Sequence, residues 1–423
     1  MNQGSKEKLL YRECIILAGG LGTRLRDVVP GLPKCLAPVA GKPFLAYVIN
    51  SLRMQGVQKF IFSLGFMSEA VLEYIDKDYP TLQYDYVIET TPLGTGGAIH
   101  LALSKATTEN VVITNGDTLY KVNLDEAFHL HLDKNAAATL LLKPMQDFDR
   151  YGVVEVDPEN KIQSFQEKKY YTAGHINGGM YILNKHSFLE RTGPGKFSFE
   201  KDFLEAHYNE GIFCGLIQDG YFIDIGIPED FARAGKDLEK KPLDLSSIDR
   251  SWTLFLDRDG VINEEKLGHY ILHWNEFIFS KGVLDVFKKL NERFGKIIVV
   301  SNQRGVGKGL MDEAALQSIH LEMQREVEIV GAGIEKIYYC TDTQDTSFFR
   351  KPNPGMAFLA LKDFTDIDPA RCVMVGNKPG DMKFGRAAGF HTVFVTTTNP
   401  EQEFPHPDID AHFPSLPAFA QTL

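Results

Sequence analysis

The chain has 423 residues, a length that favours two or three domains over one hydrophobic core. Its 43% hydrophobic and 24% charged residues are typical of a soluble globular protein, and no apolar run is long enough to span a bilayer. A net charge of −11 argues against nonspecific nucleic-acid binding, so we expect neither nucleic-acid nor membrane partners.

Apolar runs and an amphipathic segment alternate in the first part of the chain. Residues 13–18 end in glycines, the pattern of a buried parallel strand, and residues 43–55 predict an amphipathic helix. Residues 59–64 and 110–117 predict further strands, and short β-like runs within residues 136–183 predict a more antiparallel subregion. This alternation predicts a Rossmann-like, doubly wound domain with ligands at the carboxyl ends of the strands.

The second part of the chain repeats the alternation but shares no motif with the first. The polar segment 236–247, broken by Pro242, predicts a linker, and we place the domain junction near residue 245. The expected fold class is therefore α/β with two doubly wound domains, residues 1–245 and residues 246–423. The strands predicted for the second domain are residues 252–256, 296–300, 336–339, 372–375 and 392–395.

A glycine-rich loop, Leu17–Arg24, follows the first predicted strand. Its glycines leave backbone N–H groups open to a triphosphate, and Arg24 offers a fork of donors suited to phosphate. Lys34, after Pro33, supplies a point charge for the phosphoryl group that is transferred. A glycine-rich loop alone is a weak signal, but basic residues at this spacing make it more specific. The loop residues expected to bind the nucleotide are Leu17, Ala18, Gly19, Gly20, Gly22 and Thr23.

With Leu36–Pro43 downstream, residues 13–235 resemble the sugar-1-phosphate nucleotidyltransferases. The resemblance implies that a sugar 1-phosphate attacks the α-phosphorus of a nucleoside triphosphate and that pyrophosphate leaves. It also implies a divalent cation, Mg²⁺, held by Asp117 and Asp224. The other positions that it assigns are Gly94, Thr95 and Gly116 for the nucleotide, and Gly152, Glu167, Lys168 and Asn177 for the sugar phosphate.

Two aspartates, Asp257 and Asp259, follow the apolar run 253–256 and project from the same side of the strand end. One carboxylate can attack phosphorus while the other moves a proton to the leaving oxygen and back from water. A magnesium ion would offset the repulsion between carboxylate and phosphate. An isolated Asp-x-Asp is common, but the run Asp257–Asn263 is not an ordinary turn, and it predicts a phosphoryl-transfer site.

Residues 252–400 resemble the haloacid-dehalogenase superfamily of phosphatases, and most of all its capless heptose-1,7-bisphosphate and histidinol-phosphate phosphatases. The resemblance implies that Asp257 is the nucleophile and Asp259 the general acid and base. Ser301 and Lys351 would then hold the phosphate beside the nucleophile. The remaining positions that the resemblance assigns are Asn302, Arg304, Arg350 and Lys378 for the substrate, and Asp257, Asp259, Asn377 and Asp381 for Mg²⁺.

Two positions depart from this pattern. The acidic metal-binding motif usually opens Gly-Asp, whereas this chain has Asn377. Either Asn377 coordinates magnesium through its neutral amide oxygen or Asp381 moves inward, and both should weaken magnesium binding. Relatives in this subgroup often carry a Cys/His zinc loop before Arg350, but here the corresponding segment retains Cys340 and no histidine. Because tetrahedral zinc needs four ligands, we expect no zinc.

The two implied reactions would be consecutive if the sugar begins as a bisphosphate. The phosphatase would remove one phosphate and leave the sugar 1-phosphate that the nucleotidyltransferase activates. By analogy the sugar is a D-glycero-D-manno-heptose and the nucleotide is GTP, or another NTP. Two alternatives stay open: another sugar with a phosphatase for a different phosphomonoester, such as histidinol phosphate, or a non-catalytic phosphosugar-binding module. The sequence does not indicate the oligomeric state.

The N-terminus shows no secretory h-region, and five scattered cysteines show no Cys-x-x-Cys spacing. These features predict a cytoplasmic location and cysteines that act as small buried hydrophobic residues.

Overall fold

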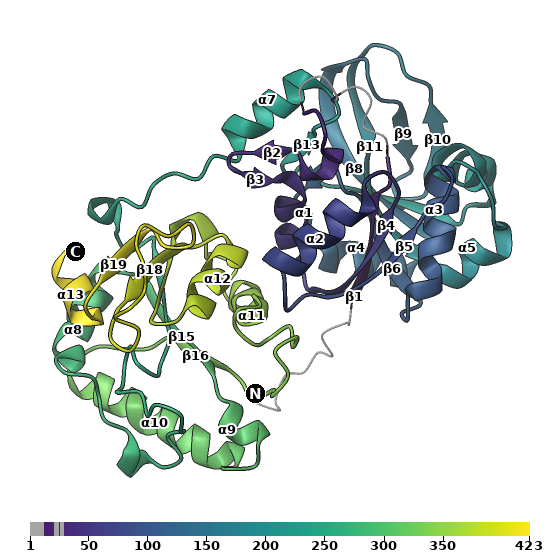
Figure 1. Ribbon diagram of the computed structural model, residues 1–423. Helices are drawn as coiled ribbons and strands as arrows, with labels where there is room; N and C mark the ends of the chain where they lie inside the picture. The colour runs from purple at the N-terminus through teal and green to yellow at the C-terminus, as the bar shows by residue number, and fades with distance from the viewer. Residues whose placement is uncertain (1–11, 21–24, 26–28) are drawn as a thin grey trace. The chain divides into compact units, whose positions relative to one another are not determined.

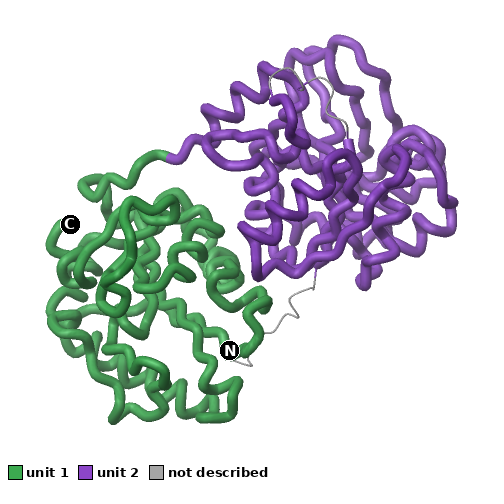
Figure 2. The backbone as a smooth tube through the Cα atoms, viewed as in Figure 1, with its two compact units in different colours: residues 1–7, 241–423 green, residues 8–240 purple. Residues whose placement is uncertain are grey.

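The structure, a computed structural model, describes residues 12–20, residue 25 and residues 29–423. The described chain divides into two compact units, one that ends at Lys240 and one that comprises Lys241–Leu423 (Figure 2). This division lies within a few residues of the junction expected near residue 245. Each unit has its own sheet and its own hydrophobic core.

The strands of the first unit form one large mixed sheet, with short two-stranded pairs beside it (Figure 1). These strands are β1 (Arg12–Ala18), β2 (Pro38–Val39), β3 (Lys42–Pro43), β4 (Val57–Leu64), β5 (Gln83–Ile88), β6 (Asn110–Asn115), β7 (Thr118–Tyr120), β8 (Ala138–Phe148), β9 (Val153–Val156), β10 (Ile162–Gln166), β11 (Tyr171–Asn184), β12 (Phe213–Ile217) and β13 (Phe222–Asp224).

Strands β6, β1, β4 and β5 are neighbours in this order and run parallel. The antiparallel pairs β6–β11, β11–β8 and β9–β10 extend the sheet, which confirms the antiparallel subregion expected within residues 136–183. The chain reverses its direction of winding between β1 and β6. Ligands of doubly wound sheets bind at such a switch point, beyond the carboxyl ends of the two strands.

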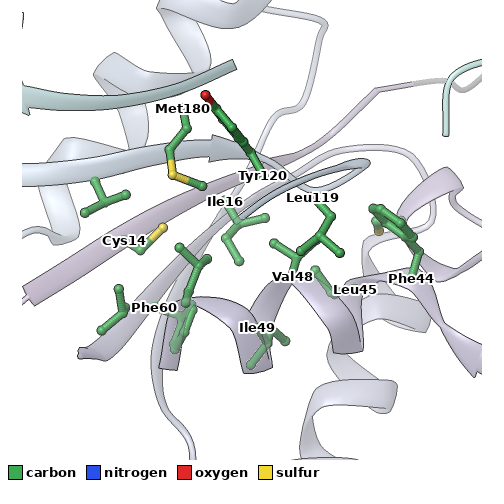
Figure 3. Packing of buried hydrophobic residues seen from close by; sticks show 14 of the residues in the cluster. Cys14, Ile16, Phe44, Leu45, Val48, Ile49, Phe60, Leu119, Tyr120 and Met180 are labelled. Atoms are coloured by element: carbon green, nitrogen blue, oxygen red, sulfur yellow. The ribbon is translucent and has the colours of Figure 1, made fainter. Parts of the chain in front are cut away.

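Helices cover both faces of the parallel half because alternate side chains of β1 face opposite ways. Cys14 and Ile16 pack against α1 in one core, whereas Ile15 belongs to a second core on the other face (Figure 3). The helices of this unit are α1 (Phe44–Arg53), α2 (Ser68–Asp78), α3 (Gly94–Ala102), α4 (Leu124–Asp133), α5 (Lys185–Arg191), α6 (Glu205–His207) and α7 (Pro228–Asp237).

The second unit has a fully parallel sheet with the order β16-β15-β14-β17-β18-β19, which reverses between β14 and β17. The sheet confirms the two-domain α/β class, and it contains one strand, β19, that the sequence pattern did not predict. Its elements are β14 (Thr253–Leu256), β15 (Lys296–Asn302), β16 (Lys336–Cys340), β17 (Cys372–Gly376), β18 (His391–Val395), β19 (Ala411–Phe413), α8 (Val283–Arg293), α9 (Arg304–Gly307), α10 (Glu313–Ile329), α11 (Gly355–Asp363), α12 (Pro379–Ala388) and α13 (Leu416–Gln421).

Helices also cover both faces of this second sheet. Val299 of β15 packs with Phe287 of α8 and Met323 of α10 in one core. On the other face, Phe255 of β14 stacks on Phe390 with ring centroids 4.6 Å apart. The five cysteines are all free and buried, as the sequence predicted. Among the described residues, no helix combines the length and apolarity that crossing a membrane requires.

Glu13 is a buried carboxylate near the start of β1. It accepts hydrogen bonds of 2.6–3.0 Å from the backbone N–H groups and hydroxyls of Thr107 and Thr108, and Lys59 lies 3.2 Å away. Burial raises the pKa of Glu13, but these hydrogen bonds outweigh burial and leave the pKa below its ordinary value. The ionised carboxylate therefore stabilises the strand that leads to the glycine-rich loop.

We expect Glu13→Gln to lower the free energy of unfolding of the first unit by about 2 kcal/mol, because an amide cannot accept all these bonds. The difference should be largest at neutral pH. It should shrink as the pH falls through the folded-state pKa, which lies below the usual glutamate range, because protonation removes the same stabilisation from the native chain. Urea unfolding at several pH values measures the difference in unfolding free energy between Glu13→Gln and the native chain, and Glu73→Gln, at an exposed position, is the control. Equal stability of Glu13→Gln and the native chain would contradict this role.

Candidate active sites

The first site lies where β1 and β6 end. Lys34 bridges two carboxylates: its ammonium contacts Asp117 and lies 3.4 Å from Asp224 Oδ1. Strand pairing explains the convergence, because β13 pairs with β7 so that Asp224 lies opposite Thr118, the residue after Asp117. Burial and the neighbouring Asp117 raise the pKa of Asp224, and Lys34 partly offsets this. The structure thus brings together three residues that the sequence singled out.

The glycines around the end of β1 have different structural roles. A Cβ on Gly19 would lie 2.7 Å from Glu89 Oε1, so the Glu89 side chain would have to move; one on Gly116 would lie 3.2 Å from the Leu17 carbonyl oxygen, a tight contact. A Cβ on Gly20 would meet nothing within 4 Å. Gly20 is also exposed, and its expected role in binding phosphate stays a prediction. Ala18, which ends β1, is only half-buried.

Gly22, Thr23 and Arg24 lie outside the described residues, so their expected roles in nucleotide binding stay predictions.

The segment at the start of α3 packs within the protein. Gly94 has a φ of +71°, and a Cβ there would lie 2.5 Å from the Phe197 carbonyl oxygen. The Thr95 hydroxyl donates to Glu200 at 2.8 Å and accepts from the Phe199 N–H at 2.9 Å. Thr95 therefore fixes the chain around residue 199, a role that the sequence did not predict; its contact with a nucleotide stays a prediction.

The residues expected to bind the sugar phosphate lie on the antiparallel extension. Asn177 sits where the β11–β8 register shifts; its amide donates to the Tyr181 hydroxyl at 2.8 Å and accepts from the Gly179 N–H at 3.0 Å. A Cβ on Gly179 would lie 2.8 Å from Asn115 Nδ2, so this irregularity packs beside the end of β6.

Glu167 and Lys168 follow β10 and are exposed. A Cβ on Gly152 would lie 2.4 Å from the Gln166 carbonyl oxygen, which brings the chain before β9 against the end of β10.

The second site lies where β14 and β17 end. Lys351 bridges two carboxylates, with its ammonium 2.8 Å from Asp257 Oδ1 and 2.6 Å from Asp381 Oδ1. All three side chains are nearly inaccessible to solvent. Burial and the charge of Asp381 raise the pKa of Asp257 to about 7, against the opposing effect of Lys351. A positive charge near Asp257 is therefore needed to keep this carboxylate ionised and nucleophilic.

Asp259 is held by a buried arginine, Arg258. The guanidinium donates to both carboxylate oxygens at 2.9 and 3.0 Å, and His320 Nε2 lies 3.2 Å from its other end. Burial raises the pKa of Asp259, but Arg258, Asn263 and Gln303 together hold it below its ordinary value. The carboxylate is therefore ionised in the substrate-free protein.

Residues at the end of β15 order the rest of this site. Gln303 Nε2 donates to Ser301 Oγ at 2.8 Å and to Asp259 Oδ2 at 3.1 Å, so it links two side chains with expected roles. The Asn302 side chain accepts from the backbone N–H of Lys351 and donates to its carbonyl oxygen, both at 3.0 Å. Asn302 therefore fixes the backbone of Lys351 in this structure.

Two arginines expected to bind substrate, Arg304 and Arg350, converge on one exposed carboxylate. Arg350 Nε donates to Asp345 Oδ1 at 3.1 Å, and Arg304 contacts the same oxygen. Among the described residues, Arg304 Nε and Arg350 Nη1 are buried without a hydrogen-bond partner. The two guanidiniums thus form an anion-binding arrangement, and each still has an N–H group without a hydrogen-bond partner.

The residues present fit a magnesium ion in both sites. Within the described chain, no three His, Cys, Asp or Glu side chains converge to hold a metal by themselves. Each site does present paired carboxylates, and burial together with the second carboxylate raises the pKa of Asp224 in one and of Asp257 in the other. In the second site, Asn377 Oδ1 is buried without a partner among the described residues. Mg²⁺ is bound in this way, by one or two carboxylates, other oxygens and substrate phosphates.

Asp381 is not placed to supply a free ligand. Its Oδ2 accepts from the backbone N–H groups of Asn377 and Lys378 at 3.2 and 3.0 Å, and its Oδ1 pairs with Lys351. Both carboxylate oxygens of Asp381 thus have protein partners, whereas Asn377 Oδ1 has none among the described residues; which of the two residues binds magnesium stays a prediction.

Sequence reasoning placed Gln303 in the phosphate-binding loop 302–304 but did not predict its bonds to Ser301 and Asp259, and it missed Arg258, Glu265 and Asp345. Arg258 stands inside a recognisable motif, and its place between Asp257 and Asp259 was the available signal. Glu265 and Asp345 come from loops, and no local pattern marks them.

The fold and both sites define a two-unit enzyme of phosphoryl chemistry. The chain belongs to the nucleotidyl transferase family, whose model matches residues 13–241. Residues 348–416 match the HAD-hydrolase-like family. The first match confirms the nucleotidyltransferase resemblance stated from the sequence, and the second shows a haloacid-dehalogenase-like segment within the second unit.

Individual relatives cover each half. The chain is 49% identical over 227 residues to the D-glycero-alpha-D-manno-heptose 1-phosphate guanylyltransferase of Aneurinibacillus thermoaerophilus, covering 54% of this chain and 98% of that protein. It is 42% identical to the enzyme of the same name from Campylobacter jejuni, covering 52% of this chain and 96% of that protein. A D,D-heptose 1,7-bisphosphate phosphatase from B. bronchiseptica, solved with magnesium and phosphate, aligns with 27% identity, 40% and 96% coverage and a TM-score of 0.37.

We expect Lys34→Met to lower nucleotidyl transfer by at least about 100-fold, because it removes the cation between Asp117 and Asp224. Phosphatase turnover, which depends on the other unit, should stay unchanged. Pyrophosphate release and phosphate release, measured separately, follow the two reactions. Lys143→Met is the matched control, since Lys143 also pairs with an aspartate, Asp219. Transfer at the native rate in Lys34→Met would show that Lys34 is not part of the machinery.

Proposed function

We propose that this chain makes a GDP-activated heptose in two steps. The phosphatase unit removes the 7-phosphate of D-glycero-D-manno-heptose 1,7-bisphosphate, and the transferase unit joins the resulting 1-phosphate to GMP from GTP. The observation that carries the proposal is the 49% identity to a heptose 1-phosphate guanylyltransferase over nearly that protein's whole length, fused to a second phosphoryl-transfer site. The second site supports the step that would supply the sugar 1-phosphate.

In the transfer step, an oxygen of the heptose 1-phosphate attacks the α-phosphorus of GTP, and the bond to the β-phosphate oxygen breaks to release pyrophosphate. No covalent enzyme intermediate is needed, so positioning and charge neutralisation carry the catalysis. Lys34 lies where an ammonium can stabilise negative charge on the phosphoryl oxygens. Asp117 and Asp224 would hold Mg²⁺, which neutralises phosphate charge when bound.

In the phosphatase step, Asp257 attacks the phosphorus of the 7-phosphate and the bond from phosphorus to the sugar oxygen breaks. Asp259 gives its proton to that leaving oxygen and recovers one from the water that hydrolyses the aspartyl-phosphate. Arg258 keeps Asp259 ionised before substrate binds. The negative charge of an arriving phosphate opposes this effect, so Asp259 takes up a proton from water as the substrate binds, and this is the proton that it gives to the leaving oxygen. Asp257 and Asn377 would hold Mg²⁺ here.

Arg304 and Arg350 support a substrate with a second anionic group. A phosphomonoesterase needs one set of donors for the phosphate it removes, which Ser301 and Lys351 supply. The arginines instead meet at Asp345, whose side chain is 70% exposed. We infer that this carboxylate stands in for the phosphate that the substrate keeps, and that it withdraws when the bisphosphate binds.

Purified chain, given GTP, Mg²⁺ and heptose 1,7-bisphosphate, should release one phosphate and one pyrophosphate per GDP-heptose. Asp257→Asn should release neither from the bisphosphate, yet should still convert added heptose 1-phosphate, because only the first step needs the nucleophile. Phosphate and pyrophosphate assays with mass spectrometry of the product measure this.

Turnover of UTP or dTTP with a hexose 1-phosphate in place of GTP with the heptose would reject the proposed substrates. Equal phosphate release by the native chain and Asp257→Asn would instead make the second unit a binding module.

We expect Asp345→Ala to lower KM for the bisphosphate several-fold with little change in kcat, because it frees two guanidiniums for the substrate. Arg350→Ala should raise KM. Asp342→Ala is the matched control, since Asp342 lies in the same loop and pairs with Ser347. Steady-state phosphate release provides the constants. A KM that is identical in Asp345→Ala and the native chain would mean that this carboxylate does not compete with substrate.

A further inference from the structure

Asn377 presents only one end of its amide to the protein around it. Its Nδ2 donates to Glu265 Oε2 at 3.2 Å and to Thr398 Oγ1. Its Oδ1 is buried and has no hydrogen-bond partner among the described residues. The residue itself is fully buried, so water from bulk solvent does not satisfy that oxygen.

The Glu265 carboxylate fixes the orientation of the Asn377 side-chain amide, with Nδ2 toward Glu265. If the amide were reversed, its oxygen would face the Glu265 carboxylate, which accepts hydrogen bonds but cannot donate one when ionised. Two acceptors would then be in contact, and the Nδ2 group would lose a charge-assisted bond. Thr398 alone could not fix the orientation, because a hydroxyl both donates and accepts.

The surroundings hold Glu265 and Asn377 together. The Lys378 ammonium pairs with Glu265 Oε1. Gly260 has a φ of +84°, and a Cβ there would lie 2.1 Å from Asn377 Nδ2 and 3.3 Å from Glu265 Oε2, so a side chain at this position would separate them. The Glu265 side chain is only 14% exposed. The contact is therefore built into the loop that follows Asp259.

We propose that Glu265 is a positioning residue that turns the Asn377 amide oxygen toward the magnesium site of the phosphatase unit. The inference rests on the proposed phosphatase function and deepens it. An aspartate at position 377 would present an acceptor in either orientation and would need no such help. An asparagine can act as a ligand only if its donor end is held away, and Glu265 does this.

Glu265 can affect Mg²⁺ binding in two ways, by orienting the Asn377 amide and by its own negative charge. Glu265 also attracts a cation through space, and that attraction acts whichever residue occupies position 377. The orienting effect exists only with asparagine there. A double-mutant cycle over Glu265→Gln and Asn377→Asp therefore isolates the orienting effect as the non-additive part.

The experiment is a calorimetric Mg²⁺ titration of the full chain without substrate. Every variant also carries Asp117→Asn and Asp224→Asn, so that the titration reports the phosphatase site alone. In the Asn377 background, Glu265→Gln should weaken Mg²⁺ binding roughly tenfold, the range for residues that orient a metal ligand. In the Asn377→Asp background, the same change should cost clearly less. Glu264→Gln, an exposed neighbour with the same charge change, should have no effect.

If Glu265→Gln lowered Mg²⁺ affinity equally in both backgrounds, Glu265 would act only through its charge, and the inference would be wrong. It would also be wrong if Glu265→Gln lowered Mg²⁺ affinity in neither background. If the Asn377 chain took up no Mg²⁺, the magnesium part of the proposed function would fail, and a metal-free measurement would then decide the inference. In EDTA, Asn377→Asp should lower the unfolding temperature by bringing two carboxylates together, and adding Glu265→Gln should restore it. If the double variant changed the unfolding temperature by the sum of the two single changes, Glu265 and Asn377 would not be coupled, and the inference would be wrong.

Discussion

A lysine ammonium between two aspartates recurs in both units, and each site depends on this charge balance. Lys34 lies between Asp117 and Asp224, and Lys351 lies between Asp257 and Asp381. Burial, and then repulsion between the two carboxylates, raises the pKa of one carboxylate in each site. One lysine offsets part of the repulsion and leaves a net negative charge. Such a site favours a divalent cation and, through it, a phosphate.

The sheets explain why the same arrangement forms twice. Each sheet reverses its winding at one point, between β1 and β6 in the first unit and between β14 and β17 in the second. The chains that leave these strand ends diverge to opposite faces, and the residues just beyond them remain close to each other. Asp117 and Asp257 both come directly or almost directly after such strands. Among the described residues, each site is built from side chains of its own unit.

The sequence predicted the elements and residues that follow local patterns. Apolar runs predicted the central strands of both sheets but not β5 or β12, and short motifs marked the aspartates and lysines that the folded chain brings together. It could not predict contacts between segments that carry no mutual signal. Thr95 is fixed by Glu200, and Asp345 occupies the arginines, because of how distant loops pack. The short edge strand β19 was missed because three residues are too few for a periodic pattern.

The departure at Asn377 fits this charge balance. Counting Lys351 against Asp257 and Asp381 leaves one negative charge, the same as Lys34 against Asp117 and Asp224. Nearby, Arg258 offsets Asp259 and Lys378 offsets Glu265. An aspartate at position 377 would add a buried charge beside Glu265 with no further lysine or arginine to balance it among these contacts. A neutral amide would instead offer an oxygen to the proposed magnesium ion without adding repulsion, provided that its orientation is fixed. The asparagine is therefore consistent with a working metal site, and it does not by itself indicate a site that has lost its chemistry.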